Sequence, residues 1–171
     1  MTDGEGLALL LLVLLAARRS AHVELAAGWV WPVPSWNGLL PQISQAFEDP
    51  RHLGVDILYR AAGRWTAPAD TPIVAANAGT VTQVYRSPRG WSVVLDHGPV
   101  FSFYQHMEST TVKRGQRVAA GERLGTMGAD PLDAQHVRHL HFELWQRVGA
   151  DVARLDPQPI MAPWSVLSWI Q

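Results

Sequence analysis

From Trp29 onward, short runs of β-branched and aromatic residues are separated by glycines, and this pattern constrains the fold more than any other feature of the chain. Such runs favour strands, and glycines at short spacing favour tight turns between antiparallel strands. We therefore predict an all-β fold with an antiparallel β-sheet sandwich-like core, short loops and one N-terminal apolar helix. The expected strands are residues 55–57, 73–75, 80–85, 91–95, 100–104, 117–118, 123–124 and 139–145.

The N-terminal helix is expected at Leu7 to Ala17, an uninterrupted apolar run. At about 1.5 Å per residue this run is much shorter than the roughly 30 Å hydrocarbon core of a bilayer, so it suits the apolar region of a secretion signal. Asp3 and Glu5 stand where a signal peptide usually carries positive charge, so a retained anchor and a helix packed on a partner stay open. We expect residues 6–19 to meet a membrane or virion partner.

Charge and cysteine content exclude several kinds of partner and site. The 171 residues include 14 basic and 15 acidic side chains, which leaves a formal net charge of −1. No basic field therefore favours nucleic acid, and we predict no nucleic-acid partner. The chain has no cysteine, so any metal ion must be held by histidine and carboxylate side chains.

Two imidazoles and a carboxylate are available for one metal ion. Asp56 follows His52 by four residues, and His139 and His141 flank Leu140 about ninety positions later. Such donors suit a catalytic zinc site that keeps its fourth position open for water. On a strand, alternate side chains share a face, so we expect His139 and His141 to point the same way.

The first pair of candidate ligands requires a bend in the chain. On a flat strand His52 and Asp56 would lie about 13 Å apart, which is too far for two donors to one ion. Gly54 lies between them and tolerates backbone angles that other residues avoid. We therefore expect the chain to bend at Gly54.

The order of the motifs resembles that of the lysostaphin-type, or LytM-like, zinc metallopeptidases, from Trp31 to about Met161. By this resemblance the zinc ligands are expected to be His52, Asp56 and His141, while His106 and His139 are expected to be non-ligand catalytic histidines. The motifs are Trp31-Pro32-Val33, His52-Leu-Gly-Val-Asp56, Thr71-Pro-Ile-Val-Ala75, Gly79-Thr-Val81, Phe103-Tyr104-Gln105-His106, Gly115-Gln-Arg-Val118, Gly121-Glu-Arg-Leu-Gly125 and His139-Leu-His-Phe-Glu143.

The resemblance implies a domain organisation and an activity. We expect an apolar leader or membrane anchor at 1–28, a LytM-like zinc peptidase domain at 29–161 and a C-terminal tail packed on it at 162–171. The implied activity is a zinc-dependent endopeptidase that hydrolyses peptide cross-links of bacterial peptidoglycan. Its cofactor would be Zn²⁺, its partner peptidoglycan, and its location the extracytoplasmic cell envelope, whether periplasmic, secreted or membrane-anchored, or alternatively a phage virion.

Two other functions stay open. One is a protein that keeps the fold to bind the cell wall or to activate another hydrolase, although such relatives typically lose ligands and this chain keeps them. The other, more remote, is a non-haem Fe(II) oxygenase, because two histidines and one carboxylate also form its ligand set. In the hydrolase, an imidazole near the metal could take a proton from water or stabilise the developing oxyanion.

Several residues near these motifs carry weaker expectations. His97, beside Asp96 and Gly98, is predicted to mark a turn, and His136 is a weaker rival for the site. Residues 130–138 lack the Gly-Ser/Thr-Gly approach that the family usually has before its histidine pair. Glu143 is either an acceptor for a ligand imidazole or an outward-facing strand residue. Trp65 and Trp91 could line a groove, although most of the eight tryptophans are expected in the core or at its rim.

Overall fold

A computed structural model describes residue 25 and residues 27–170. The predicted apolar helix and the partner segment at 6–19 lie outside these residues. No helix in the described part of the chain is long and apolar enough to cross a membrane. The elements are β1 (Ser35–Trp36), β2 (Pro41–Gln45), β3 (Val55–Ala61), β4 (Arg64–Thr66), β5 (Pro72–Val74), β6 (Gly79–Ser87), β7 (Gly90–Asp96), β8 (Val100–Thr110), β9 (Arg117–Val118), β10 (Arg123–Met127), β11 (Leu140–Val148), β12 (Asp151–Leu155), α2 (Pro157–Met161) and β13 (Ser168–Trp169).

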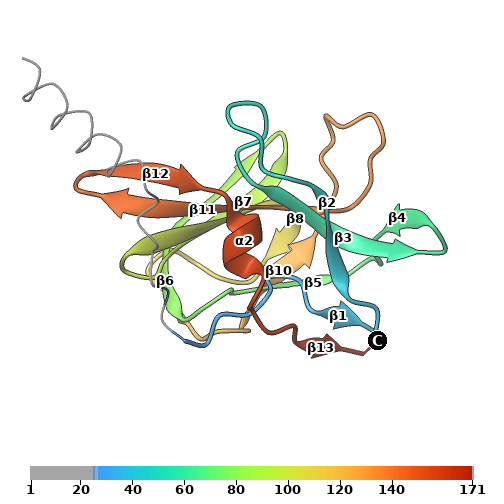
Figure 1. Ribbon diagram of the computed structural model, residues 1–171, viewed down its shortest axis with the longest axis horizontal. Helices are drawn as coiled ribbons and strands as arrows, with labels where there is room; N and C mark the ends of the chain where they lie inside the picture. Colours follow the sequence, from blue (N-terminus) through green and yellow to red (C-terminus); the bar gives the residue numbers. More distant parts are fainter. Residues whose placement is uncertain (1–24, 26, 171) are drawn as a thin grey trace, which may run out of the picture.

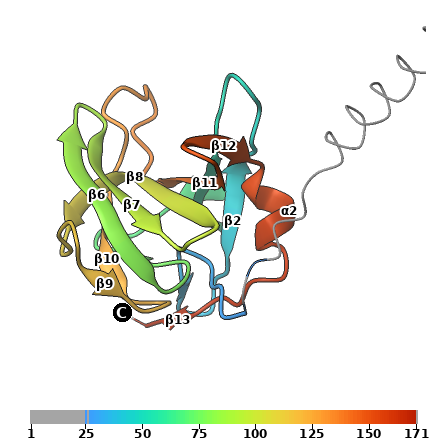
Figure 2. The ribbon, with the colours of Figure 1, turned by 90° about the vertical axis from the view of Figure 1, so that its left-hand side faces the viewer.

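Among the described residues, eleven of the strands form one sheet, in which the central order is β2-β3-β11-β8-β7-β6-β9. Every pairing in this sheet is antiparallel. The sheet curves strongly, so that β6 and β7 lie on one side of the molecule and β2 on the other (Figure 2). The predicted all-β, antiparallel, sandwich-like fold is confirmed.

Alternation of side chains explains why the predicted strands form. In β11, Leu140, Phe142 and Leu144 are buried in the hydrophobic core, because residues two apart share a face of the strand. The strand continues to Val148, three residues beyond the predicted end, because its outer half pairs with β12.

Some elements escaped prediction because they carry weak local signals. Strands β2, β4 and β12 have mostly polar or exposed residues and form by pairing with β3 or β11. The one-turn helix α2 was also missed. It begins after Asp156, whose side chain accepts a hydrogen bond from the Gln158 backbone, with Pro157 at its first position. Figure 1 shows α2 against the curved sheet.

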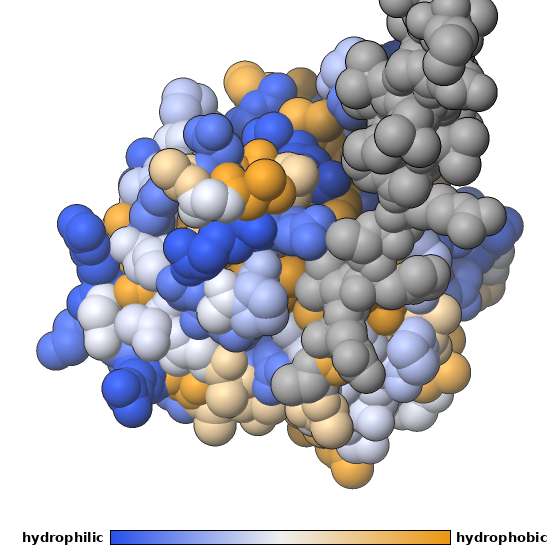
Figure 3. Space-filling view, turned by 60° about the vertical axis from the view of Figure 1, so that its left-hand side comes forward, coloured by the Kyte–Doolittle hydropathy of each residue, from blue (hydrophilic) through white to orange (hydrophobic). Residues whose placement is uncertain are grey.

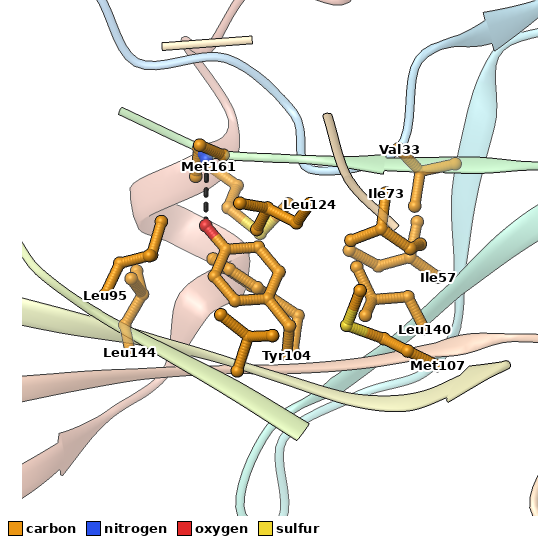
Figure 4. Close-up of a cluster of buried hydrophobic side chains, with 14 of the residues drawn as sticks. Val33, Ile57, Ile73, Leu95, Tyr104, Met107, Leu124, Leu140, Leu144 and Met161 are labelled. Carbon is orange, nitrogen blue, oxygen red and sulfur yellow. Dashed lines mark hydrogen bonds between the residues drawn. The ribbon is translucent and has the colours of Figure 1, made fainter. Parts of the chain in front are cut away.

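The core fills the interior of the curved sheet. Figure 4 shows Tyr104 of β8 between Leu95, Leu144 and Leu124, with its hydroxyl accepting a 2.8 Å hydrogen bond from the Ala76 backbone N–H. A polar chain continues from this hydroxyl through Ser102 to His97, with separations of 2.9 and 2.7 Å. The buried phenol is therefore satisfied, as a polar group in a core must be.

The last residues close one end of the core. Strand β13 pairs in parallel with β1, and the Trp164 ring stacks on Trp29 with a centroid separation of 4.7 Å. Both tryptophans are buried. On the face drawn in Figure 3, hydrophobic residues occur in small groups among hydrophilic ones. Through the strand pairing and the ring stacking, Trp164 and the strand Ser168–Trp169 pack against the first described residues of the domain.

Candidate metal centre and catalytic site

Three side chains converge on one point at the surface of the sheet. His52 Nε2 lies 3.0 Å from Asp56 Oδ1 and 3.1 Å from His141 Nδ1, and the latter two atoms are 2.9 Å apart. All three groups offer ligand atoms within 4.8 Å of one another. The three residues predicted as metal ligands therefore lie together.

Pairing of β3 with β11 brings two of these residues together, because Asp56 is the direct cross-strand partner of His141. His52 lies in the preceding loop, where its backbone N–H and C=O bond reciprocally to Glu48 at 2.7 Å. The chain bends at residues 53 and 54, and this brings His52 Nε2 within 3.0 Å of Asp56 Oδ1, as the spacing of the two residues required.

Gly54 is needed at this turn for a reason other than the predicted one. It is not among the residues with positive φ. A Cβ atom at Gly54 would overlap the Phe142 carbonyl oxygen and come within 2.8 Å of Glu143 Cγ. The prediction that Gly54 is needed for its backbone angles was therefore wrong. Gly54 is needed because the absence of a side chain lets the loop lie close against β11.

The second nitrogen of each candidate ligand imidazole has its own acceptor. His52 Nδ1 lies 2.8 Å from the Ala46 carbonyl oxygen, and His141 Nε2 lies 3.1 Å from Glu143 Oε1. The other Glu143 oxygen accepts bonds from Trp145 at 2.7 Å and Arg154 at 3.1 Å. The sequence left two interpretations of Glu143, an imidazole acceptor or an outward-facing strand residue. The structure shows the acceptor, because the side chain is buried and bonds His141.

Charge is concentrated around His141. Burial lowers the pKa of His141, but its hydrogen bonds to the Asp56 and Glu143 carboxylates outweigh this and raise it to about 9. Burial alone would raise the pKa of Asp56, yet the His141 hydrogen bond and the neighbouring imidazoles lower it overall. For Glu143, too, bonds to His141 and Trp145 overcome burial and lower the pKa. Both carboxyls are therefore ionised at neutral pH.

The two predicted catalytic histidines lie beside the three donors. The His106 and His139 ring centroids are 4.8 Å apart, and that of His106 is 5.9 Å from that of His141. His139 Nδ1 bonds the Val137 carbonyl oxygen at 2.8 Å, and its Nε2 lies 3.8 Å from Asp56 Oδ2. Both histidines line the same cleft of about 760 Å³ as the donors.

His106 reaches the cleft through an irregularity in β8. Residues 105 and 106 both line the cleft, although neighbours on a regular strand point to opposite faces. The φ angle of His106 is +64°, and the register of β8 shifts against β7 between residues 104 and 107. The register against β10 shifts close by, between Met107 and Ser109. This is a β-bulge, which re-aims one side chain at a site. We call it the His106 bulge.

Two glycines enclose the His106 bulge. A Cβ atom at Gly90 would lie 2.9 Å from the Met107 carbonyl oxygen, and one at Gly128 would lie 2.7 Å from the His106 carbonyl oxygen. The Gly128 N–H also donates a 2.7 Å bond to that oxygen, and His106 Nδ1 bonds the Arg89 carbonyl oxygen at 3.0 Å. Burial holds the pKa of His106 well below its usual value, so the ring is neutral at pH 7.

Residues 51–157 match the model of peptidase family M23. This chain belongs to peptidase family M23. The match confirms the lysostaphin-type, LytM-like resemblance found in the motifs.

Three comparisons with individual proteins show how far the similarity extends. The chain is 33% identical over 138 residues to an uncharacterized lipoprotein, YgeR, of Escherichia coli, covering 79% of this chain and 47% of that protein. It is 35% identical over 81 residues to the peptidoglycan DD-endopeptidase ShyA of Vibrio cholerae, covering 45% and 18%. A putative glycyl-glycine endopeptidase lytM from Ruminococcus gnavus shares its fold with a TM-score of 0.64 at 23% identity, covering 82% and 62%. The chain spans less than half the length of the two curated relatives.

The donor set of this M23 domain fits a zinc ion. Donor atoms that all bond one zinc ion at about 2.0–2.2 Å must lie close to one another. Here His52 Nε2, Asp56 Oδ1 and His141 Nδ1 are separated by 2.9–3.1 Å. The hydrogen bonds of the two remaining imidazole nitrogens to a backbone carbonyl and a carboxylate are those that orient ligand histidines in metal sites.

The other residues singled out in the sequence lie in different places. Trp65 lines the cleft, whereas Trp91 packs against the core. His97 marks a turn, as predicted, before Gly98 with φ of +93°. His136 is exposed in the loop before β11 and does not line the cleft.

Sequence reasoning missed two residues at the site. Arg89 in the β6–β7 turn forms an ion pair with Asp130, and both line the cleft beside His106. Asp130 is buried, and its Oδ2 lies 3.9 Å from His106 Nε2. The two residues are 41 positions apart, so no local pattern connects them.

Proposed function

We propose that this M23 protein is a zinc-dependent endopeptidase that hydrolyses peptide cross-links of bacterial peptidoglycan. The observation that carries the proposal is the convergence of five side chains on one cleft: His52, Asp56 and His141 as zinc ligands, with His106 and His139 beside them. Membership of the family and similarity to a peptidoglycan DD-endopeptidase support the choice of substrate.

The ligands and the two further histidines have separable tasks in this proposal. When bound, Zn²⁺ supplies Lewis acidity and lowers the pKa of a coordinated water to about 7. His106 and His139 each donate their Nδ1–H to a backbone carbonyl oxygen, so in the neutral ring Nε2 is the free acceptor. Each ring can therefore receive a proton at Nε2, or in its protonated form donate a hydrogen bond to an oxyanion.

The substrate implies the location. Peptidoglycan lies outside the cytoplasmic membrane, so the protein would act in the extracytoplasmic cell envelope, and the similarity to a lipoprotein supports this. A phage virion that delivers the enzyme to the wall is the alternative setting. In either setting Trp65, at the edge of the cleft, offers an aromatic surface for the wall polymer.

The test is cleavage of purified peptidoglycan by the full chain, with and without zinc and a chelator, followed by mass spectrometry of the products. We expect release of peptide-containing fragments that stops with chelator and returns with zinc. Stoichiometric zinc without any cleavage would overturn the endopeptidase in favour of a wall-binding or activator role. Iron with oxoacid-dependent turnover would instead support an oxygenase.

A further inference from the structure

The ion pair between Arg89 and Asp130 joins the two segments that enclose the His106 bulge. Arg89 directly precedes Gly90, and Asp130 follows Gly128 by two residues. These two glycines are the ones that pack against the bulge from either side. The ion pair therefore connects the β6–β7 turn to the loop that precedes β11.

Arg89 contacts the bulge through its backbone and this loop through its side chain. Its carbonyl oxygen accepts the 3.0 Å bond from His106 Nδ1, while its Nη1 donates to Asp130 Oδ2. Arg89 thus orients the imidazole and, with the same residue, holds the loop that carries Gly128. Displacement of Arg89 would disturb both supports of the His106 ring.

Both carboxylate oxygens of Asp130 take part in contacts that hold the loop before β11. Its side chain is only 7% exposed, and its Oδ1 accepts a 2.9 Å bond from the Leu132 N–H, which shapes the start of the loop. Its Oδ2 faces both Arg89 and, at 3.9 Å, His106 Nε2. A buried carboxylate needs such partners, because an unpaired buried charge is costly.

A bulge with positive φ at a non-glycine residue also needs support from its surroundings. Such a conformation is strained and persists only where neighbouring structure imposes it. The hydrogen bond from Gly128 to His106 and the fit of the two glycines supply part of this support.

We infer that Arg89 and Asp130 are positioning residues that hold the His106 bulge, and with it the His106 imidazole, in the geometry needed for turnover. This inference rests on the proposed function, which gives His106 its catalytic role. It does not involve the three metal donors. Neither residue belongs to the three donors, so their loss should leave zinc binding intact.

The test replaces Asp130 in Asp130→Asn, with Asp96→Asn as a matched control. Asp96 makes the same two kinds of contact away from the cleft: its Oδ1 accepts from the Gly98 N–H at 2.8 Å, and its Oδ2 pairs with Arg147 at 2.7 Å. For Asp130→Asn we expect kcat on a soluble cross-linked muropeptide to fall between about tenfold and about 100-fold, as for a displaced catalytic group, with KM and zinc content unchanged. Asp96→Asn should keep the wild-type kcat.

A readout independent of activity is the ¹⁵N NMR signature of the His106 ring. In the wild-type protein we expect a single tautomer with the proton on Nδ1, and in Asp130→Asn a mixture or a shifted signal. Arg89→Lys, which keeps the charge but loses the planar fork, should show a smaller change in the same direction, and it serves if Asp130→Asn does not fold. Unchanged His106 signals in a folded variant would overturn the inference. A wild-type protein without cleavage would sink the proposed function alone, because the NMR comparison still decides the positioning role.

Discussion

Strands β8 and β11 both deliver histidines to one cleft, but they do so in opposite ways. On β11 the delivery is regular: His141 and Glu143 alternate with the core residues Leu140 and Phe142. On β8 the delivery depends on a bulge, since strict alternation would send His106 to the same side as Tyr104, into the core. The comparison teaches that alternation along a strand is enough to aim His141 at the cleft, whereas the aim of His106 depends on contacts made by distant turns.

The largest effect is expected on the regular strand. His141→Ala removes one of the three converging donors, so we expect zinc binding and peptidoglycan cleavage to fall to background together. Metal analysis and the cleavage assay measure the two losses. His136→Ala, which alters an exposed histidine outside the cleft, is the control and should behave as wild type. Full zinc occupancy in His141→Ala would remove this residue from the ligand set.

A substitution at the His106 bulge should lower turnover without changing zinc binding. His106→Ala should lower kcat by about 10²–10⁴-fold, the usual contribution of general acid–base catalysis, while zinc content stays at the wild-type level. Steady-state kinetics on a soluble muropeptide and metal analysis of the same sample check this. A near-normal kcat would exclude His106 from the mechanism and would end the contrast between the two strands.

A smaller effect is expected further along β11, where Glu143 accepts a hydrogen bond from the His141 imidazole. Glu143→Gln removes the charge that holds His141 Nε2–H, so zinc affinity should drop between about 10- and 100-fold. Competition with a chelating dye measures this drop. Glu108→Gln changes an exposed carboxylate on β8 and should leave the affinity unchanged. Equal affinities in the two variants would contradict a role for Glu143 in metal binding.

The smallest effect concerns the regular part of β8, where His97 bonds Ser102. Burial lowers the pKa of His97 in the folded protein. Above about pH 6.5, the usual histidine pKa, both folded and unfolded chains are neutral here and stability is full; as pH falls below it, the unfolded chain takes up a proton that folded His97 resists, so stability falls.

The measurement is the melting temperature at pH 7.5 and 5.5. His97→Gln should lose a part of the decrease seen in the wild-type protein, because the other histidines contribute equally to both proteins. An identical decrease in the two proteins would show that His97 does not titrate with unfolding. Activity at pH 7.5 should change little, since His97 lies outside the cleft.

The same contrast explains what could be predicted from the sequence. Alternation and glycine spacing were sufficient for the antiparallel sheet and for the shared face of His139 and His141. The His106 bulge could not be predicted, because it is held by Gly90 and Gly128, which only the folded sheet brings against it. Arg89 and Asp130 had no signal for the same reason, and the motif order found His106 only through its resemblance to the family.

The fold also determines when the core can be completed during synthesis of the chain. Strand β1, near the start of the described residues, finds its partner in β13, and Trp29 finds its stacking partner in Trp164. Contacts between such distant positions form late, because a long loop must close before they are made. A nascent chain emerging from the ribosome therefore keeps Trp29 without its stacking partner until Trp164 has been made, and an M23 domain built this way completes its core only after residues 164–169 have emerged.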